Sequence, residues 1–199
     1  MKVPEFPNDA WAYIPETYRA GTPHGLLLWL HAPEAFEWDE LVAQWKPQCD
    51  RDSWILLAPK SGDPKRWDRT ELPLVRKLVD QISADYSIDP ARIVLAGHDV
   101  GGAMAMLAAS QNRDVVRGVA IVDAPLAARI APNEPQQPLA FYVVKAAGSK
   151  HAAAVDKSVE QLREAKYPVT VKSLGEEPRL LEAEERAELS RWIDTLDRL

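Results

Sequence analysis

Residues 93–105 read IVLAGHDVGGAMA, an apolar run followed by a glycine-flanked turn and then by a segment of small residues. This order predicts a buried strand that passes through a tight turn directly into a helix. Such a turn holds its central residue, Asp99, in a strained backbone conformation, so the positions two before and two after it must be small. Gly97 and Gly101 meet that requirement. The stretch therefore predicts a strand–turn–helix unit with Asp99 at its apex.

Apolar runs alternate with amphipathic segments on both sides of this unit. The runs that predict buried strands are residues 26–30, 54–58, 92–96, 115–122, 139–144 and 169–174. Residues 11–15 predict a further strand at the sheet edge, because Pro15 cannot donate to a ladder. Apolar residues at helical spacing predict three helices: one after a cap at Thr70, one after His151 and one near the C-terminus. The pattern predicts an α/β fold, a three-layer sandwich with a mostly parallel sheet and helices on both faces.

Composition narrows the classes of function. The chain has 199 residues, 46% of them apolar and 27% charged, with a formal net charge of −6. We expect one domain over residues 1–199, which is soluble and is either complete or one module of a longer protein. The acidic balance argues against nucleic acid as a partner, and no apolar stretch predicts a signal peptide or a membrane span. The single cysteine, Cys49, lies near Pro47 at a predicted helix end and implies neither a disulfide nor a metal site.

Several segments together resemble the α/β-hydrolase superfamily, in particular its small esterases of the carboxylesterase or phospholipase type that lack a cap domain. The segments are IDPAR at 88–92 and GAMA at 102–105 around the turn, with YIPE at 13–16, LWLH at 28–31 and LAP at 57–59. The resemblance implies that residues 97–101 form a nucleophile elbow. It also implies a hydrolase architecture without a cap, and no cofactor.

The resemblance further implies a serine nucleophile, an acid and a histidine, and this sequence departs at each position. Asp99 stands at the nucleophile position, Ser149 at the acid position and Glu176 at the histidine position. The acyl-enzyme route to ester cleavage needs the missing hydroxyl. We therefore expect a catalytically inactive protein that binds or scaffolds an unknown small molecule or protein. If the chain is an enzyme, it is a hydrolase.

The resemblance also implies an oxyanion loop after the strand at residues 26–30. The loop reads His31, Ala32, Pro33, and Pro33 has no N–H to donate. Val100, directly after the elbow residue, would supply the other donor. Together with Trp67, in a loop that borders the cleft of the resembling esterases, His31, Ala32 and Val100 are the predicted binding residues.

Three alternatives remain open. Asp99 also occupies the position of the nucleophile in epoxide hydrolases and haloalkane dehalogenases, which use a carboxylate but also need a late histidine and a cap. A rearranged ester hydrolase would take Ser149 as nucleophile, His151 or His31 as base and Asp99 as the orienting acid. Finally, Asp99 and Glu176 could lie close enough to share a proton or to hold a cation.

The four histidines are the candidates for the missing base. We expect His24 to be exposed, His31 to have a structural role, and the side chain of His98 to point away from Asp99. His151 follows the acid loop at a helix start, and it is either a partly exposed helix-terminal residue or the base.

Overall fold

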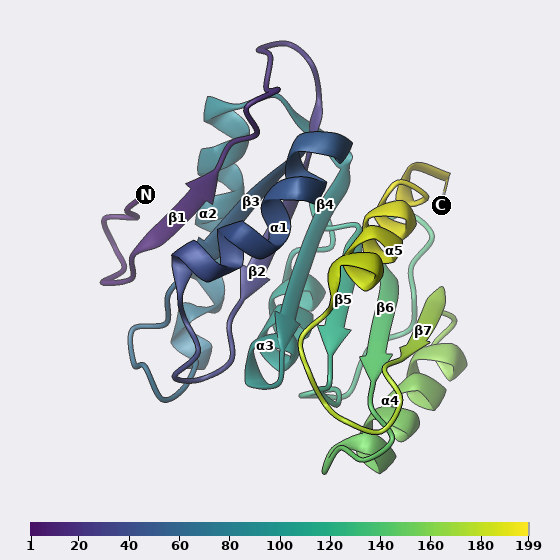
Figure 1. The fold of residues 1–199 in the computed structure, drawn as a ribbon. Coiled ribbons are helices and arrows are strands. Elements are labelled where there is room, and N and C mark those ends of the chain that lie inside the picture. The colour runs from purple at the N-terminus through teal and green to yellow at the C-terminus, as the bar shows by residue number, and fades with distance from the viewer. Residues whose placement is uncertain (199) are drawn as a thin grey trace.

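The computed structural model describes residues 1–198 and contains one seven-stranded sheet (Figure 1). The strands are β1 (Ala10–Tyr13), β2 (His24–Leu30), β3 (Trp54–Pro59), β4 (Ile88–His98), β5 (Gly118–Val122), β6 (Ala140–Lys145) and β7 (Val169–Ser173). Their order across the sheet is β1-β3-β2-β4-β5-β6-β7. β1 pairs antiparallel with β3 at the edge, and all other pairs are parallel. The predicted edge strand and the parallel sheet are therefore confirmed.

Helices cover both faces of this sheet (Figure 1). α1 (Trp38–Asp52) and α5 (Ala183–Ile193) pack on one face. α2 (Leu72–Asp85), α3 (Val100–Gln111) and α4 (Ala152–Glu164) pack on the other. Two short 3₁₀ helices, at Arg69–Glu71 and Leu196–Arg198, complete the elements. The predicted three-layer α/β sandwich is confirmed.

β2 shows why the central strands are continuously apolar. All seven of its residues are buried. Leu26, Leu28 and Leu30 belong to the core under α2 and α3, while Leu27 and Trp29 belong to the core under α1 and α5. Successive side chains of a strand point to opposite faces, so a strand covered on both faces needs apolar residues at every position.

Two local predictions were wrong. Asp68, not Thr70, caps the helical segment: its carboxylate accepts the Thr70 N–H, and Glu71 completes a capping box. Pro47 lies inside α1 rather than at its end. The helix continues past the proline because Trp45 and Cys49 are buried against the sheet, which outweighs the local cost of the proline. Burial also raises the pKa of the Cys49 thiol to about 12, in keeping with its expected structural role.

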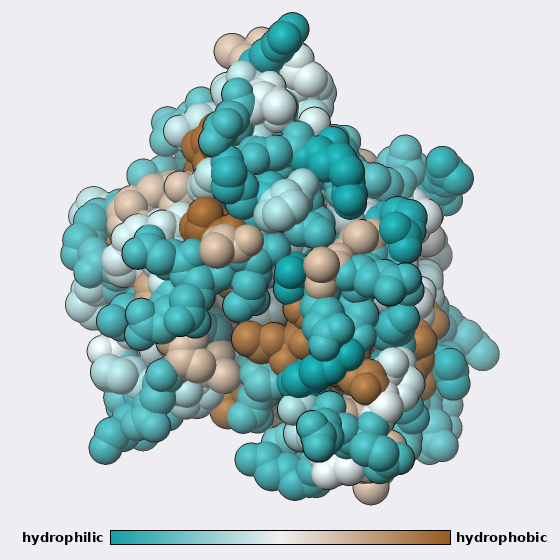
Figure 2. Space-filling view, viewed as in Figure 1, coloured by the Kyte–Doolittle hydropathy of each residue, from teal (hydrophilic) through white to brown (hydrophobic). Residues whose placement is uncertain are grey.

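The surface over α1 and α5 is mainly hydrophilic, with small hydrophobic patches between polar side chains (Figure 2). Such scattered patches are ordinary for a folded protein. Over the described part of the chain, no helix combines the length and the apolar character needed to cross a membrane.

Candidate functional site

The turn between β4 and α3 has the geometry that its sequence predicts. Asp99 has φ 50° and ψ −124°, a conformation that side-chain-bearing residues rarely adopt, and its N–H donates to the carbonyl of Val122 at 3.0 Å. A Cβ added to Gly97 would lie 2.5 Å from the backbone of Gly101, and one added to Gly101 would lie 2.1 Å from the carbonyl oxygen of Leu30. The two glycines are therefore required by close backbone contacts, which fix Asp99 at the carboxyl edge of the sheet.

A second aspartate bends the chain in the same way at the end of the neighbouring strand. Asp123 directly follows β5, has φ 50°, and donates its N–H to the carbonyl of Val144 at 2.9 Å. Its side chain is buried, with the residue only 6% exposed. Because β4 and β5 are parallel neighbours, both carboxylates emerge at the edge of the sheet where α/β proteins hold their ligands.

His151 brings an imidazole to Asp99. It is the residue before the first turn of α4, and its Nε2 lies 3.4 Å from Oδ1 of Asp99. The two side chains are 26% and 33% exposed, but the Nε2 atom itself is buried and has no hydrogen-bond partner within residues 1–198. His151 is thus a partly exposed helix-terminal residue that also faces the elbow carboxylate. A helix-terminal position and a role as base were the two alternatives for His151, and its placement is compatible with both.

Ser149 connects His151 to the second aspartate. Its Oγ–H donates to Oδ2 of Asp123 at 2.8 Å, and its Oγ accepts the backbone N–H of His151 at 3.0 Å. The hydroxyl proton of Ser149 therefore goes to a carboxylate and not to an imidazole. This geometry does not form the rearranged arrangement in which Ser149 is the nucleophile.

Asp123 was missed by the sequence analysis. The available signal was a carboxylate immediately after a buried strand next to the elbow strand, since the carboxyl ends of neighbouring parallel strands meet at one edge. The resemblance implies an acid after β6, where the chain has Ser149, so it does not point to a carboxylate after β5. The structure shows that Ser149 binds an acid supplied by the preceding strand.

Glu176 does not pair with Asp99 in the structure. Its side chain is exposed, and its carbonyl oxygen accepts the N–H of Gly148 at 2.8 Å. An exposed carboxylate at this position is solvated by water. Within residues 1–198, no group of three His, Cys, Asp or Glu side chains is arranged to hold a metal ion.

The remaining histidines have separate environments. Burial lowers the pKa of His98, against smaller opposing effects of Asp99 and Asp123, and no hydrogen bond in residues 1–198 joins His98 to Asp99. His24 was expected to be exposed, which is wrong: it is 1% exposed, and its Nδ1 lies 2.8 Å from the carbonyl oxygen of Thr22.

His31 has the structural role that was expected. Its Nδ1–H donates to the Ala32 carbonyl at 2.6 Å, and its Nε2 accepts the Ser61 N–H at 3.1 Å. Burial lowers the pKa of His31, consistent with a neutral ring that donates at one nitrogen and accepts at the other. The indole N–H of Trp67 donates to the His31 carbonyl at 2.9 Å, and Trp67 is only 8% exposed. His31 and Trp67 therefore hold together the loop that follows β2.

Comparisons with known proteins agree with this architecture. No family model matches the chain. Solved structures that resemble it include a thermostable esterase (16% identity, 99% of this chain and 58% of that chain, TM-score 0.71) and the Bacillus cereus carboxylesterase (15%, 96% and 95%, 0.69). An arylesterase aligns with a TM-score of 0.74 at 12% identity, covering 98% of this chain and 82% of that chain. The chain has the α/β-hydrolase fold.

Among curated proteins, a bifunctional acetylxylan esterase/xylanase of Neocallimastix patriciarum is 25% identical over 123 residues. The match covers 59% of this chain and 18% of that protein, so the chain spans less than a fifth of its relative's length. These likenesses establish the fold of the chain and leave the chemistry of its elbow to be argued from its own residues.

The backbone N–H that directly follows the elbow residue lies at the start of α3. Val100 is the first residue of α3, so its N–H has no acceptor within the helix and is available to a ligand. The residue is 39% exposed. In the loop after β2, Pro33 has no N–H to donate, as the sequence predicts.

A cavity of about 280 Å³ lies beside the elbow. Its lining includes His31 and Ala32 from the loop after β2 and His98 from the end of β4. Trp29, Leu41 and Leu180 supply apolar surface. The predicted binding residues His31 and Ala32 therefore line a hollow large enough for a small organic molecule, whereas Trp67 packs behind His31.

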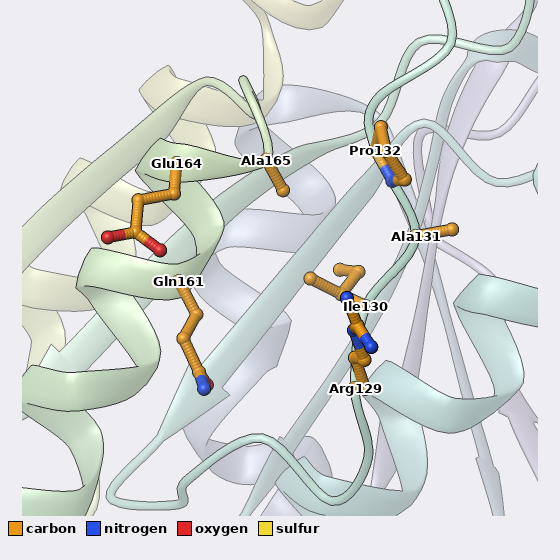
Figure 3. Close-up of a pocket in the computed structure, with 7 residues that line it drawn as sticks. All are labelled: Arg129, Ile130, Ala131, Pro132, Gln161, Glu164 and Ala165. Atoms are coloured by element: carbon orange, nitrogen blue, oxygen red, sulfur yellow. The ribbon is translucent and has the colours of Figure 1, made fainter.

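A larger hollow, of about 580 Å³, lies elsewhere on the molecule. Residues 129–132 form one wall, and Gln161 and Glu164 of α4, with Ala165 just beyond it, form the other (Figure 3). None of the predicted site residues lines it. The larger hollow therefore lies apart from the predicted site residues.

Proposed function

We propose that this chain is a hydrolase in which Asp99 is the nucleophile and His151 is the base. The observation that carries the proposal is the placement of the His151 Nε2, which is buried, without a hydrogen bond, and 3.4 Å from a carboxylate at the strained apex of the elbow. The histidine that the hydrolase fold usually supplies after β7 is replaced here by one at the start of α4. The proposal corresponds to the reaction of epoxide hydrolases and haloalkane dehalogenases, in which a carboxylate is the nucleophile, with His151 close enough to Asp99 to serve as the base.

The chemistry of a carboxylate nucleophile defines the substrate class. Attack on an ester carbonyl would give a reactive anhydride, whereas attack on a saturated carbon gives an ordinary ester. The proposed substrates are therefore small alkyl electrophiles, such as epoxides or haloalkanes. In the first step an Asp99 oxygen forms a bond to the alkyl carbon while the carbon–halogen or carbon–oxygen bond breaks. The products are an aspartyl ester and either a halide ion or an alkoxide that takes a proton from water.

Water then cleaves the aspartyl ester. His151 removes a proton from water, the hydroxide attacks the Cγ of Asp99, and the Val100 N–H stabilises the developing oxyanion. Collapse breaks the bond between Cγ and the alkyl oxygen, and His151 returns the proton to the departing alcohol. Asp99 is left as a carboxylic acid, and loss of its proton to the solvent regenerates the carboxylate. The cavity lined by Trp29, Leu41 and His98 is the proposed place for the alkyl group.

Mass spectrometry of the intact protein after a rapid quench tests the proposal, with 1,2-epoxyhexane and 1-bromohexane as probes. We expect an adduct on Asp99 in the wild-type protein, and none in Asp99→Asn. In His151→Gln the adduct should persist, because loss of a general base slows hydrolysis by about 10²- to 10⁴-fold. Glu177→Gln, which changes an exposed carboxylate outside the site, is the matched control and should behave as wild type. Absence of an adduct in both the wild type and His151→Gln would refute the proposal.

A second candidate is a catalytically silent domain that binds or scaffolds a small molecule or a protein. Two observations favour it: Pro33 removes one oxyanion donor, and the exposed Glu176 occupies the position where the resembling esterases carry their histidine. Residues 1–199 would then act as one binding domain, alone or as a module of a longer protein. In that case the probes leave no adduct on Asp99 in any variant, while the fold and the cavity are unchanged.

A further inference from the structure

The side chain of Asp123 is buried with only one of its two oxygens in a hydrogen bond. Oδ2 accepts the hydroxyl proton of Ser149, while Oδ1 is buried and has no partner within residues 1–198. The residue is 6% exposed and has φ 50°. Burial of a carboxylate with an unused oxygen costs free energy, and so does a positive φ in a residue with a side chain. Because Asp123 carries both of these free-energy costs, we expect it to have a role other than packing.

Asp123 lies at the end of a chain of contacts that reaches Asp99. The carboxylate holds the Ser149 hydroxyl at 2.8 Å, and the Ser149 oxygen holds the His151 N–H at 3.0 Å. The His151 imidazole then lies 3.4 Å from Asp99. Asp123 also raises the pKa of His98 against the larger effect of burial, which places its charge near the same group of side chains.

A local turn explains only part of this arrangement. A serine oxygen that accepts the N–H two residues later is a common turn motif. In such a turn the hydroxyl proton is free to bond to water, but here it is directed to a buried carboxylate from another strand. The start of α4 is thereby tied to the end of β5. The His151 side chain itself makes no cap hydrogen bond at this end of α4.

We propose that Asp123 and Ser149 form a positioning pair that holds the His151 imidazole against Asp99. Neither residue touches the substrate. The pair fixes the backbone of His151 at its N–H, and so the point from which the imidazole extends. The catalytic consequence rests on the proposed function, but the geometric claim does not.

Nuclear magnetic resonance tests the geometric claim without any turnover. In the wild type, Asp99→Asn should shift the His151 ring resonances, because the two groups are in contact. In a Ser149→Ala background the same substitution should shift them far less, whereas Ser149→Thr, which keeps the hydroxyl, should restore the response. Asp123→Asn keeps an oxygen for the serine hydroxyl and tolerates positive φ, so it should preserve the coupling. An equal response to Asp99→Asn in the wild-type and Ser149→Ala backgrounds would overturn the positioning pair.

Partial reactions of the epoxide probe test the catalytic consequence. Ser149→Ala should leave the rate of adduct formation on Asp99 unchanged but slow adduct hydrolysis by roughly 10- to 100-fold, since a misplaced base loses about this much. A loosened fold would slow both steps equally, which would count against positioning. If the resonance coupling is lost in Ser149→Ala but no variant ever forms an adduct, the positioning pair stands and the proposed function fails. If adducts form and Ser149→Ala hydrolyses them at the wild-type rate, the positioning pair fails and the proposed function stands.

Discussion

Replacement of Asp99 by glycine should stabilise the protein while it removes the proposed nucleophile. At φ 50° and ψ −124° the backbone is in a region open to glycine and strained by about 1–3 kcal/mol for a residue with a Cβ. Two terms oppose the gain: glycine adds about 0.5–1 kcal/mol of unfolded-state entropy, and the partly exposed contact with His151 contributes at most about 1 kcal/mol. The expected net effect is an increase of about 1 kcal/mol in the free energy of unfolding.

Thermal and urea unfolding would measure this change, and in a chain of this length about 1 kcal/mol corresponds to roughly 2–4 °C in Tm. Asp99→Ala is the matched variant, because it loses the same side-chain contact but keeps a Cβ and therefore the strain. Glycine should be more stable than alanine at this position. The order should reverse at Lys157, an exposed site inside α4, where alanine is favoured by about 1 kcal/mol. If alanine is the more stable residue at both positions, the elbow is not strained and the reasoning is refuted.

Two further predictions concern stability. Gly101→Ala places a Cβ 2.1 Å from the carbonyl oxygen of Leu30 and should destabilise the fold by about 3 kcal/mol or more, seen as a large fall in Tm, whereas a fall below 1 °C would contradict the close contact. Burial lowers the pKa of His31 and His98 in the folded state, so the unfolded chain binds more protons just below about pH 6.5, and the free energy of unfolding should fall on acidification through that range. Urea midpoints from pH 8 to 5.5 should decrease, and His98→Asn should flatten the decrease; a rising midpoint would show the opposite sign.

The fold was predictable because its signals are local and redundant. The apolar runs of the buried strands and the glycines of the elbow both follow from backbone geometry, and the structure places them as expected. Pro47 shows the limit of local signals. A proline ordinarily predicts the end of a helix, but α1 continues past Pro47 because Trp45 and Cys49 are buried against the sheet. Tertiary packing of this kind is not visible in a short window of sequence.

The site was predictable only in part, because its contacts join residues that are far apart in the chain. Asp99 was found from its own turn, but its contact with His151 depends on where the loop after β6 lies in space. His24 is a second example. Its predicted place in a loop suggested an exposed side chain, but in the structure Tyr18 packs against it and the side chain is buried. Whether Asp99, Ser149, Glu176 and His151 act in catalysis stays a prediction.

The parallel sheet explains how an imidazole from the loop after β6 can face the elbow. β4, β5, β6 and β7 lie side by side and point the same way, so the residues that follow them meet along one edge. A side chain after β6 and one after β7 can therefore approach the same carboxylate from neighbouring loops. Here the imidazole comes from the loop after β6, and an acid comes from the end of β5. Loss of a motif residue at its usual position thus does not establish loss of its role, which must be sought among all the side chains that the sheet brings to that edge.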